Sequence, residues 1–312
     1  MNSAERIRAL RDNIERAIRG KGDAVKFAVV ALLAKGHLLI EDIPGVGKTT
    51  LASSLARSIG ATFRRVQFTS DLLPSDIIGV TVFNPDLHAF EFKRGPLFAN
   101  IVLADELNRA TPKTQSSLLE AMGEFRVTVD SVTHALPNPF FVVATLNPVE
   151  HHGTYPLPDS QLDRFLMRIE MGYPDEEAEK EIIVRQRIVQ PSETLEPVLS
   201  AEEVVILQRR VREIHVDESL LNYMLALVKE TRKHPAVELG VSPRGSLSLY
   251  RSAQSLALVE GRSFVVPDDI RAVAVAVLAH RFVLKPTAAP GRSGQTARVI
   301  MEDILRRIPV PV

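Results

Sequence analysis

The chain has no cysteine and no net charge, because its 312 residues include 38 Lys and Arg and 38 Asp and Glu. The absence of cysteine excludes disulfides, thiol nucleophiles and Cys-ligated metal ions, and it fits a reducing, cytoplasmic location. The charge balance leaves no overall field that would draw the chain onto nucleic-acid phosphates, so only a local basic patch could bind them. The composition therefore argues against a nucleic-acid partner.

Long apolar runs are absent as well. The longest, residues 27–34 and 272–279, fall far short of the roughly 20 residues that a membrane-spanning helix needs, and they indicate buried helices. The first residues, MNSAERIRALRDNIERAI, carry charges throughout and lack the apolar centre of a signal peptide. We expect neither a transmembrane segment nor export. The length suits about two globular domains.

Helical and strand patterns alternate in the first half of the chain. An N-terminal helix with an apolar residue every three or four positions and a second helix over residues 24–36 precede a predicted strand at 37–42. Further strands are predicted at residues 63–69, 99–106 and 139–147. Each strand is followed by a helical segment, which predicts a mostly parallel sheet with helices on both faces.

Two segments interrupt this alternation, and the second half of the chain abandons it. Residues 79–95 and 125–136 alternate apolar and polar side chains around turn residues, which predicts two inserted β-hairpins. From about Tyr173 the patterns are helical, at residues 174–187, 201–214, 217–233, 243–261 and 267–282. The sequence thus predicts an α/β core over residues 1–172 and a small all-α domain over residues 173–312.

The segment PGVGKTT, between a predicted strand and a predicted helix, has the features of a phosphate-binding loop. Gly45 and Gly47 let backbone N–H groups approach phosphates, Lys48 would contact the β and γ phosphates, and Thr49 would hold Mg²⁺. The alternative is a helix start with a surface lysine. The predicted nucleotide-binding residues are Pro44, Gly45, Val46, Gly47, Lys48, Thr49 and Thr50.

Polar residues at the ends of two later strands add catalytic chemistry. The strand IVLADE ends in Asp105, which could bind Mg²⁺ through water, and Glu106, which could activate an attacking water. Asn147 ends the next strand and could hydrogen-bond the γ-phosphate and that water, although Asn is also a common turn residue before Pro148. Together with the loop, these residues predict hydrolysis of a nucleoside triphosphate with Mg²⁺.

Five segments, taken in order, resemble the MoxR family of AAA+ ATPases, which are relatives of the magnesium-chelatase ATPase subunit. They are PGVGKT, LADELNRATPKTQSSLLEAM, ATLNPVEHHGTYPLPDSQLDRF, GYPDEEAE and GVSPRG. The resemblance implies a P-loop AAA+ core with a helical lid and a homo-oligomeric ring, commonly a hexamer, with ATP at each interface. It further implies chaperone-like remodelling or maturation of client complexes, often with partners that carry von Willebrand factor A domains.

The resemblance also assigns two arginines. Arg164 of LDRF would reach the γ-phosphate of the neighbouring subunit, as a guanidinium delivered in trans, and Arg244 of SPRG would reach the phosphates from the lid. A surface ion pair is the alternative for Arg164. Arg244 follows Pro243 at a helix start, where a cation is poorly placed in the field of the helix. Arg109 could be a second trans contact or part of a structural salt bridge.

Three positions depart from the expected patterns. Asp42 stands where the phosphate-loop motif begins with Gly, and its carboxylate would have to point away from the phosphates. Leu146 replaces the Gln that is frequent in MoxR-like chains, and His151 and His152 replace acidic or amide residues. The two histidines lack the Cys or acidic neighbours of a zinc site, so we expect no metal there.

Two other functions remain as alternatives: one uses the same ATP chemistry, and the other uses the same phosphate loop. A nucleic-acid motor or clamp loader could use the hairpins as contacts, but the zero net charge and the lack of a winged-helix or basic tail count against it. A GTP-binding switch would need a guanine-reading Asn-Lys-x-Asp motif, which the chain does not contain.

Overall fold

The computed structural model describes residues 2–148, 153–177, 179–180, 194–286 and 293–311. A five-stranded sheet in the order β2-β5-β8-β1-β9 forms the centre of the molecule, and all of its neighbouring strands are parallel. The strands are β1 (Leu38–Glu41), β2 (Phe63–Gln67), β5 (Ile101–Asp105), β8 (Phe141–Leu146) and β9 (Met167–Ile169). The predicted parallel sheet is confirmed. The edge strand β9 was not predicted, because its 3 residues are too few to show a periodicity.

The central strands are apolar along most of their length because both faces of the sheet are covered. Leu38 and Ile40 face one hydrophobic core, whereas Leu39 between them faces the other. The first core is built with helices α1 (Ser3–Ala17), α2 (Gly22–Leu33) and α3 (Lys48–Ser58). The second is built with helices α4 (Pro74–Ile78) and α5 (Pro112–Glu124). The predicted α/β layering is therefore present.

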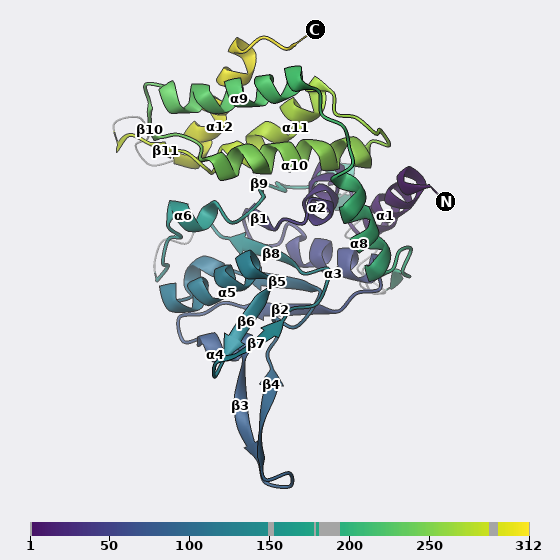
Figure 1. Cartoon of the computed structure of the whole chain (residues 1–312), viewed down its shortest axis with the longest axis vertical. Coiled ribbons are helices and arrows are strands. Elements are labelled where there is room, and N and C mark those ends of the chain that lie inside the picture. The colour runs from purple at the N-terminus through teal and green to yellow at the C-terminus, as the bar shows by residue number, and fades with distance from the viewer. Residues whose placement is uncertain (1, 149–152, 178, 181–193, 287–292, 312) are drawn as a thin grey trace.

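Both predicted hairpins form. The first consists of β3 (Gly79–Asn84) and β4 (Ala89–Arg94), and it projects from the sheet at the end opposite the C-terminal helices (Figure 1). The second consists of β6 (Arg126–Val129) and β7 (Val132–Ala135). Asp130 and Ser131 join its strands with φ angles of 47° and 67°, a left-handed pair that suits a tight two-residue turn.

The C-terminal region is a helical lid that lies above the sheet in Figure 1. Helix α8 (Ala201–Val211) packs against α2 and α10 (Pro243–Val259) and precedes the other helices of this region, which are α9 (Glu218–Lys233), α10, α11 (Pro267–Leu278) and α12 (Ser293–Arg307). Helices α8 to α11 were predicted. Helix α12 and a short antiparallel pair, β10 (Val237–Leu239) with β11 (Val283–Leu284), were not. The predicted helix over residues 174–187 lies mostly outside the described residues.

The lid contacts the core through two of its helices. Helix α10 packs against α2, and helix α11 packs along the edge strand β9. The first hydrophobic core is consequently continuous from the sheet through α2 into the lid. Within the described parts of the chain, no helix is long and apolar enough to cross a bilayer.

Candidate active site

The phosphate loop joins β1 to α3 by two left-handed glycines. Gly45 has φ 85° and Gly47, the N-cap of α3, has φ 96°. A Cβ added at Gly45 would meet no atom within 4 Å, so the backbone conformation, and not space, requires glycine there. The loop leaves the free N–H groups of the α3 N-terminus directed at one site, which favours an anion.

A cavity of about 330 Å³ lies beside this helix N-terminus. Its lining combines the predicted residues Pro44, Gly45, Gly47, Lys48, Thr49, Thr50, Asp105, Glu106 and Asn147 with two residues that were not predicted, Arg65 and Gln67. Val46 does not line it, because its side chain is 8% exposed and packs in the first hydrophobic core. The fold therefore brings three strand ends and the loop together, as parallel strands with a common carboxyl edge must.

Lys48 begins α3 and is held at the mouth of the loop. Its Nζ donates a hydrogen bond to the backbone oxygen of Asp42 at 2.6 Å. Burial lowers the pKa of Lys48, and the nearby carboxylates of Asp42, Asp105 and Glu106 oppose that shift. The ammonium group therefore has a backbone acceptor whose place a phosphate oxygen could take.

Asp105 is held on both carboxylate oxygens. Thr145 Oγ1 donates to its Oδ1 at 2.7 Å, and the Arg65 guanidinium donates to its Oδ2 from Nη2 at 2.7 Å and from Nε at 3.1 Å. Arg65 also donates to Gln67 at 3.1 Å. These contacts fix the orientation of the carboxylate toward the cavity.

Glu106 lies next to Asp105 in a left-handed conformation, with φ 56° and ψ 50°. Such a conformation is strained for a non-glycine residue and is frequent at functional sites. Its backbone N–H donates to Thr145 Oγ1 at 2.8 Å, and its Oε2 accepts from Gln67 Nε2 at 2.8 Å and from Arg109 Nη1 at 2.9 Å. Arg109 thus forms a salt bridge within its own chain, the structural alternative considered for it.

Asp42 does point away from the phosphate loop. Its Oδ2 accepts from the backbone N–H groups of Met171 at 2.7 Å and Gly172 at 2.6 Å, and its Oδ1 accepts from Ile43 at 2.8 Å. The residue that replaces the first glycine of the motif therefore ties the end of β1 to the segment after β9. The cavity lining does not include it.

The two arginines predicted to act on phosphates lie outside this cavity. Arg164 Nη1 donates to the backbone oxygen of Leu119 on α5 at 2.6 Å. Arg244 is exposed in the first turn of α10, whose N-cap is Ser242. His151 and His152 lie outside the described residues, so the expectation that they hold no metal stays untested. Leu146 ends β8 and is half-buried.

Sequence reasoning missed three polar residues of the site. Arg65 and Gln67 alternate in β2, so both side chains point to the same face, and that period-two polar pattern was a usable signal. Thr145 carried no such signal, since a threonine inside an apolar strand is ordinary, and only the pairing of β5 with β8 shows that it bridges Asp105 and Glu106.

Comparisons with known proteins agree with this geometry. Residues 37–167 match the model of the ATPase family associated with various cellular activities (AAA), and residues 229–304 match the AAA lid domain. Chaperone MoxR1 of Mycobacterium tuberculosis is 41% identical over 307 residues, which cover 96% of this chain and 80% of that protein. The chain belongs to the MoxR family of AAA ATPases.

Other relatives of this MoxR-family chain extend the similarity over its whole length. The protein YeaC of Bacillus subtilis is 51% identical over 301 residues, which cover 96% of this chain and 93% of YeaC. A crystal structure of a protein from Cytophaga hutchinsonii superposes with a TM-score of 0.92 at 36% identity, covering 99% of this chain and 96% of that one. Magnesium-chelatase subunits are more distant, at 26% identity over 245 residues for the homologue from Methanocaldococcus jannaschii.

Proposed function

We propose that this MoxR-family ATPase binds ATP with Mg²⁺ in the cavity beside α3 and uses its hydrolysis for chaperone-like remodelling or maturation of partner protein complexes. The observation that carries the proposal is the convergence of Lys48, Asp105, Glu106 and Asn147 on one cavity at the helix N-terminus. Phosphoryl transfer depends mostly on positioning and charge stabilisation, and these residues supply both.

Each residue has a distinct role in this proposal. Residues 45–50 bind the phosphates through backbone N–H groups, and Pro44, which has no N–H, lines the start of the loop. Lys48 exchanges its bond to the Asp42 carbonyl for one to a phosphate oxygen. Glu106 accepts a proton from the attacking water, and Gln67 and Arg109 hold its carboxylate in place. Asn147 donates to the γ-phosphate or orients that water.

The oxygen ligands that line the cavity are suitable for Mg²⁺. The Thr49 hydroxyl and the Asp105 carboxylate both line the cavity and are hard oxygen ligands, the type that Mg²⁺ prefers. The described residues contain no group of three or more His, Cys, Asp or Glu that could hold a metal ion by itself, which fits an ion that arrives with the nucleotide phosphates. When bound, Mg²⁺ would neutralise charge on the transferring phosphoryl group.

A homo-oligomeric ring, commonly a hexamer in the family, completes the proposed site. Arg164 would reach the nucleotide of the neighbouring subunit, and Arg244 would contact the nucleotide of its own subunit from the lid. We propose residues 1–172 as the nucleotide-binding core and residues 173–312 as the lid. The name of the relative MoxR1, a chaperone, supports client remodelling, and proteins with von Willebrand factor A domains are the partners we propose.

The proposal is tested by comparing two variants, one in the phosphate loop and one at the end of β5. Lys48→Ala should abolish ATP binding, whereas Glu106→Gln should keep ATP bound and block its hydrolysis, because one residue holds phosphate and the other activates water. With ATP present, affinity-tagged Glu106→Gln should therefore retain client proteins that Lys48→Ala does not.

Nucleotide binding, phosphate release and mass spectrometry of retained proteins are the measurements. Normal turnover by Glu106→Gln would show that the residue does not activate water. Identical protein sets on both variants would argue against nucleotide-dependent client binding. Stimulation of the ATPase by DNA at physiological salt would favour a nucleic-acid motor instead.

A further inference from the structure

Arg281, just after lid helix α11, forms hydrogen bonds to the chain segment that contains Arg164. Its side chain is 1% exposed, and its Nε donates to Asp163 Oδ1 at 2.9 Å. Its Nη1 donates to the backbone oxygen of Leu166 at 3.1 Å, and its Nη2 donates to that of Phe165 at 2.5 Å. A single lid side chain therefore binds residues on both sides of Arg164.

The same guanidinium is tied equally well into the lid. Nη1 also donates to the Val277 carbonyl, and Nη2 donates to Ser248 Oγ on α10 at 3.2 Å. Burial lowers the pKa of Arg281 to about 10, and the charge of Asp163 opposes that shift. The cation is thus charged at neutral pH and saturated with partners from two lid helices and one core segment.

Asp163 connects its salt bridge with Arg281 to the start of α10. Its second oxygen, Oδ2, accepts a long hydrogen bond of 3.5 Å from Ser242 Oγ, the N-cap of α10. Arg244, which we propose contacts the nucleotide of its own subunit, lies two residues after Ser242 in the first turn of that helix. A movement of the lid on its nucleotide would therefore pull on Asp163, the residue that immediately precedes Arg164.

The contact that holds Arg164 in place is small. Its guanidinium rests on the carbonyl of Leu119 in α5 and passes over Gly123, where a Cβ would stand 2.9 Å from Nη1. The side chain is only half-buried. A small rotation of the segment around Asp163 would be enough to redirect it.

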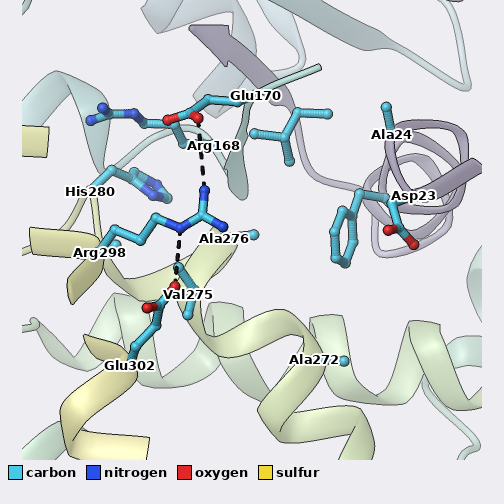
Figure 2. Close-up of a pocket in the computed structure, with 13 residues that line it drawn as sticks. Asp23, Ala24, Arg168, Glu170, Ala272, Val275, Ala276, His280, Arg298 and Glu302 are labelled. Atoms are coloured by element: carbon cyan, nitrogen blue, oxygen red, sulfur yellow. Dashed lines mark hydrogen bonds and ion pairs between the residues drawn. The ribbon is translucent and has the colours of Figure 1, made fainter. Parts of the chain in front are cut away.

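The lid has a second ionic attachment to the core that offers a comparison. Figure 2 shows Arg298 of α12 between Glu170, just after β9, and Glu302 on its own helix. The pair with Glu170 is long, at 3.7 Å, and its side chains are 54% and 60% exposed. Exposed pairs of this kind contribute little, so this contact is a suitable control.

We propose that Asp163 and Arg281 are positioning residues that transmit the position of the lid to Arg164. The nucleotide bound in one subunit would then determine the position of Arg164 of that subunit relative to the nucleotide of the neighbouring subunit. This inference rests on the proposed function, since it assumes that Arg164 acts on nucleotide in trans.

Two variants break the salt bridge between Asp163 and Arg281, which we call the link, in different ways. Asp163→Asn keeps a side chain of the same size but leaves the buried Arg281 without its counter-charge. Because an unpaired buried charge can unfold a protein, the double variant Asp163→Asn/Arg281→Met removes both charges together, a replacement that proteins often tolerate. Arg298→Gln is the matched control at the exposed attachment.

We expect both link variants to bind a fluorescent ATP analogue with affinity within about threefold of the parent, since the phosphate loop is untouched. Their kcat should fall by about 10 to 100-fold, the loss that misplacement of a catalytic group by about 1 Å can cause. Arg298→Gln should change kcat by less than about twofold.

The decisive measurement is the combination with Arg164→Ala. If Asp163 acts through Arg164, adding Asp163→Asn to Arg164→Ala should lower kcat no further, because residues that act as one unit are not additive. A merely structural effect would multiply with the loss caused by Arg164→Ala. Asp163→Glu, which retains the charge, should recover part of the kcat that Asp163→Asn loses.

Each failure has a separate meaning. Multiplicative losses, or normal kcat in a folded Asp163→Asn/Arg281→Met protein, overturn the positioning role alone. Normal turnover by Arg164→Ala overturns the trans role of that arginine in the proposed function, and the inference falls with it. Loss of ATP affinity in the link variants would also overturn the positioning role, because it would show that these residues act on the nucleotide of their own subunit.

Discussion

At the scale of single residues, the segment after β9 is held from two sides. Asp42 accepts hydrogen bonds from the N–H groups of Met171 and Gly172, while Lys21 Nζ donates to the carbonyls of residues 171, 172 and 173 at 2.8, 2.9 and 2.5 Å. Both charged groups are about nine-tenths buried, at 9% exposure each. The segment that leads from the sheet into the lid therefore has its backbone groups satisfied by side chains rather than by a neighbouring strand.

Replacement of Asp42 should separate stability from nucleotide affinity. Asp42→Gly restores the residue that the motif expects, and it should change ATP affinity by less than about tenfold. It also removes the acceptor for three N–H groups, so the free energy of unfolding should fall by at least about 1.5–3 kcal/mol, the range for one hydrogen bond to a charged group. Urea unfolding and equilibrium nucleotide binding measure the two effects.

Asp42→Asn is the control, because it keeps one acceptor oxygen and should lose less stability than Asp42→Gly. Complete loss of ATP binding in a folded Asp42→Gly protein would mean that the carboxylate acts on the nucleotide. Unchanged stability would mean that its bonds to residues 171 and 172 contribute nothing.

At the scale of elements, a buried histidine joins one helix to two strands. His37, which precedes β1 and is 3% exposed, accepts a hydrogen bond from the Val142 N–H at Nδ1, at 3.1 Å. Its Nε2 is 3.0 Å from the carbonyl of Met122 on α5 and must therefore carry the proton. Burial lowers the pKa of His37 to about 4, so the ring is neutral in the folded protein at physiological pH.

This histidine should make stability depend on pH in a defined window. Unfolded His37 gains a proton near pH 6.5, whereas the folded form resists protonation until about pH 4, so its contribution is complete above pH 6.5 and is lost as the pH falls toward 4. Between pH 7 and pH 5 the loss should be about 2 kcal/mol.

Denaturant unfolding of the parent and of His37→Gln at both pH values tests this expectation. The variant is less stable overall, but its stability should fall by about 2 kcal/mol less over this range. His280, whose pKa burial also lowers, supplies a second contribution that the variant retains. Equal pH dependence in both proteins would show that His37 titrates normally in the folded state.

At the scale of the whole molecule, the core and the lid share one hydrophobic interior. Leu32 and Leu33 of α2 belong to the same buried cluster as Leu249 and Leu256 of α10, and Ile169 of β9 belongs to it as well. The lid therefore cannot move far from the sheet without exposing apolar surface that the core and the lid now bury together.

Assembly is tested by mixing two inactive proteins. Arg164→Ala should leave ATP affinity nearly intact but reduce hydrolysis by about 10³ or more, the range for arginines delivered in trans. Lys48→Ala has a dead nucleotide site and an intact Arg164. Mixed rings would contain interfaces that pair an intact site with an intact arginine, so phosphate release should reappear on mixing.

Neither protein can do this alone, and a mixture of Lys48→Ala with the Lys48→Ala/Arg164→Ala double variant is the matched negative control. If the single variants co-assemble and the mixture stays inactive, the interfacial site is wrong. Turnover per wild-type subunit that does not change with dilution down to clear monomer would have the same meaning.

The local features of this protein were determined by its sequence. Gly45 and Gly47 are needed where the backbone turns left-handed, the buried strands must be apolar on both faces, and Asp105, Glu106 and Asn147 follow strands whose ends meet at one sheet edge. Each of these depends on neighbours along the chain or on the general rule for parallel sheets, so the phosphate loop, the mostly parallel sheet and the hairpins could be predicted.

Only the tertiary structure decided the contacts between distant residues. Asp42 binds residue 171 across 129 positions, and Arg281 binds Asp163 across 118. Nothing in the local pattern shows which buried charge pairs with which, because that choice depends on how α11 lies against β9 and how β1 ends beside it. Thr145 was missed for the same reason: its importance comes from the pairing of β5 with β8, which brings together parts of the chain that carry no mutual signal in the sequence.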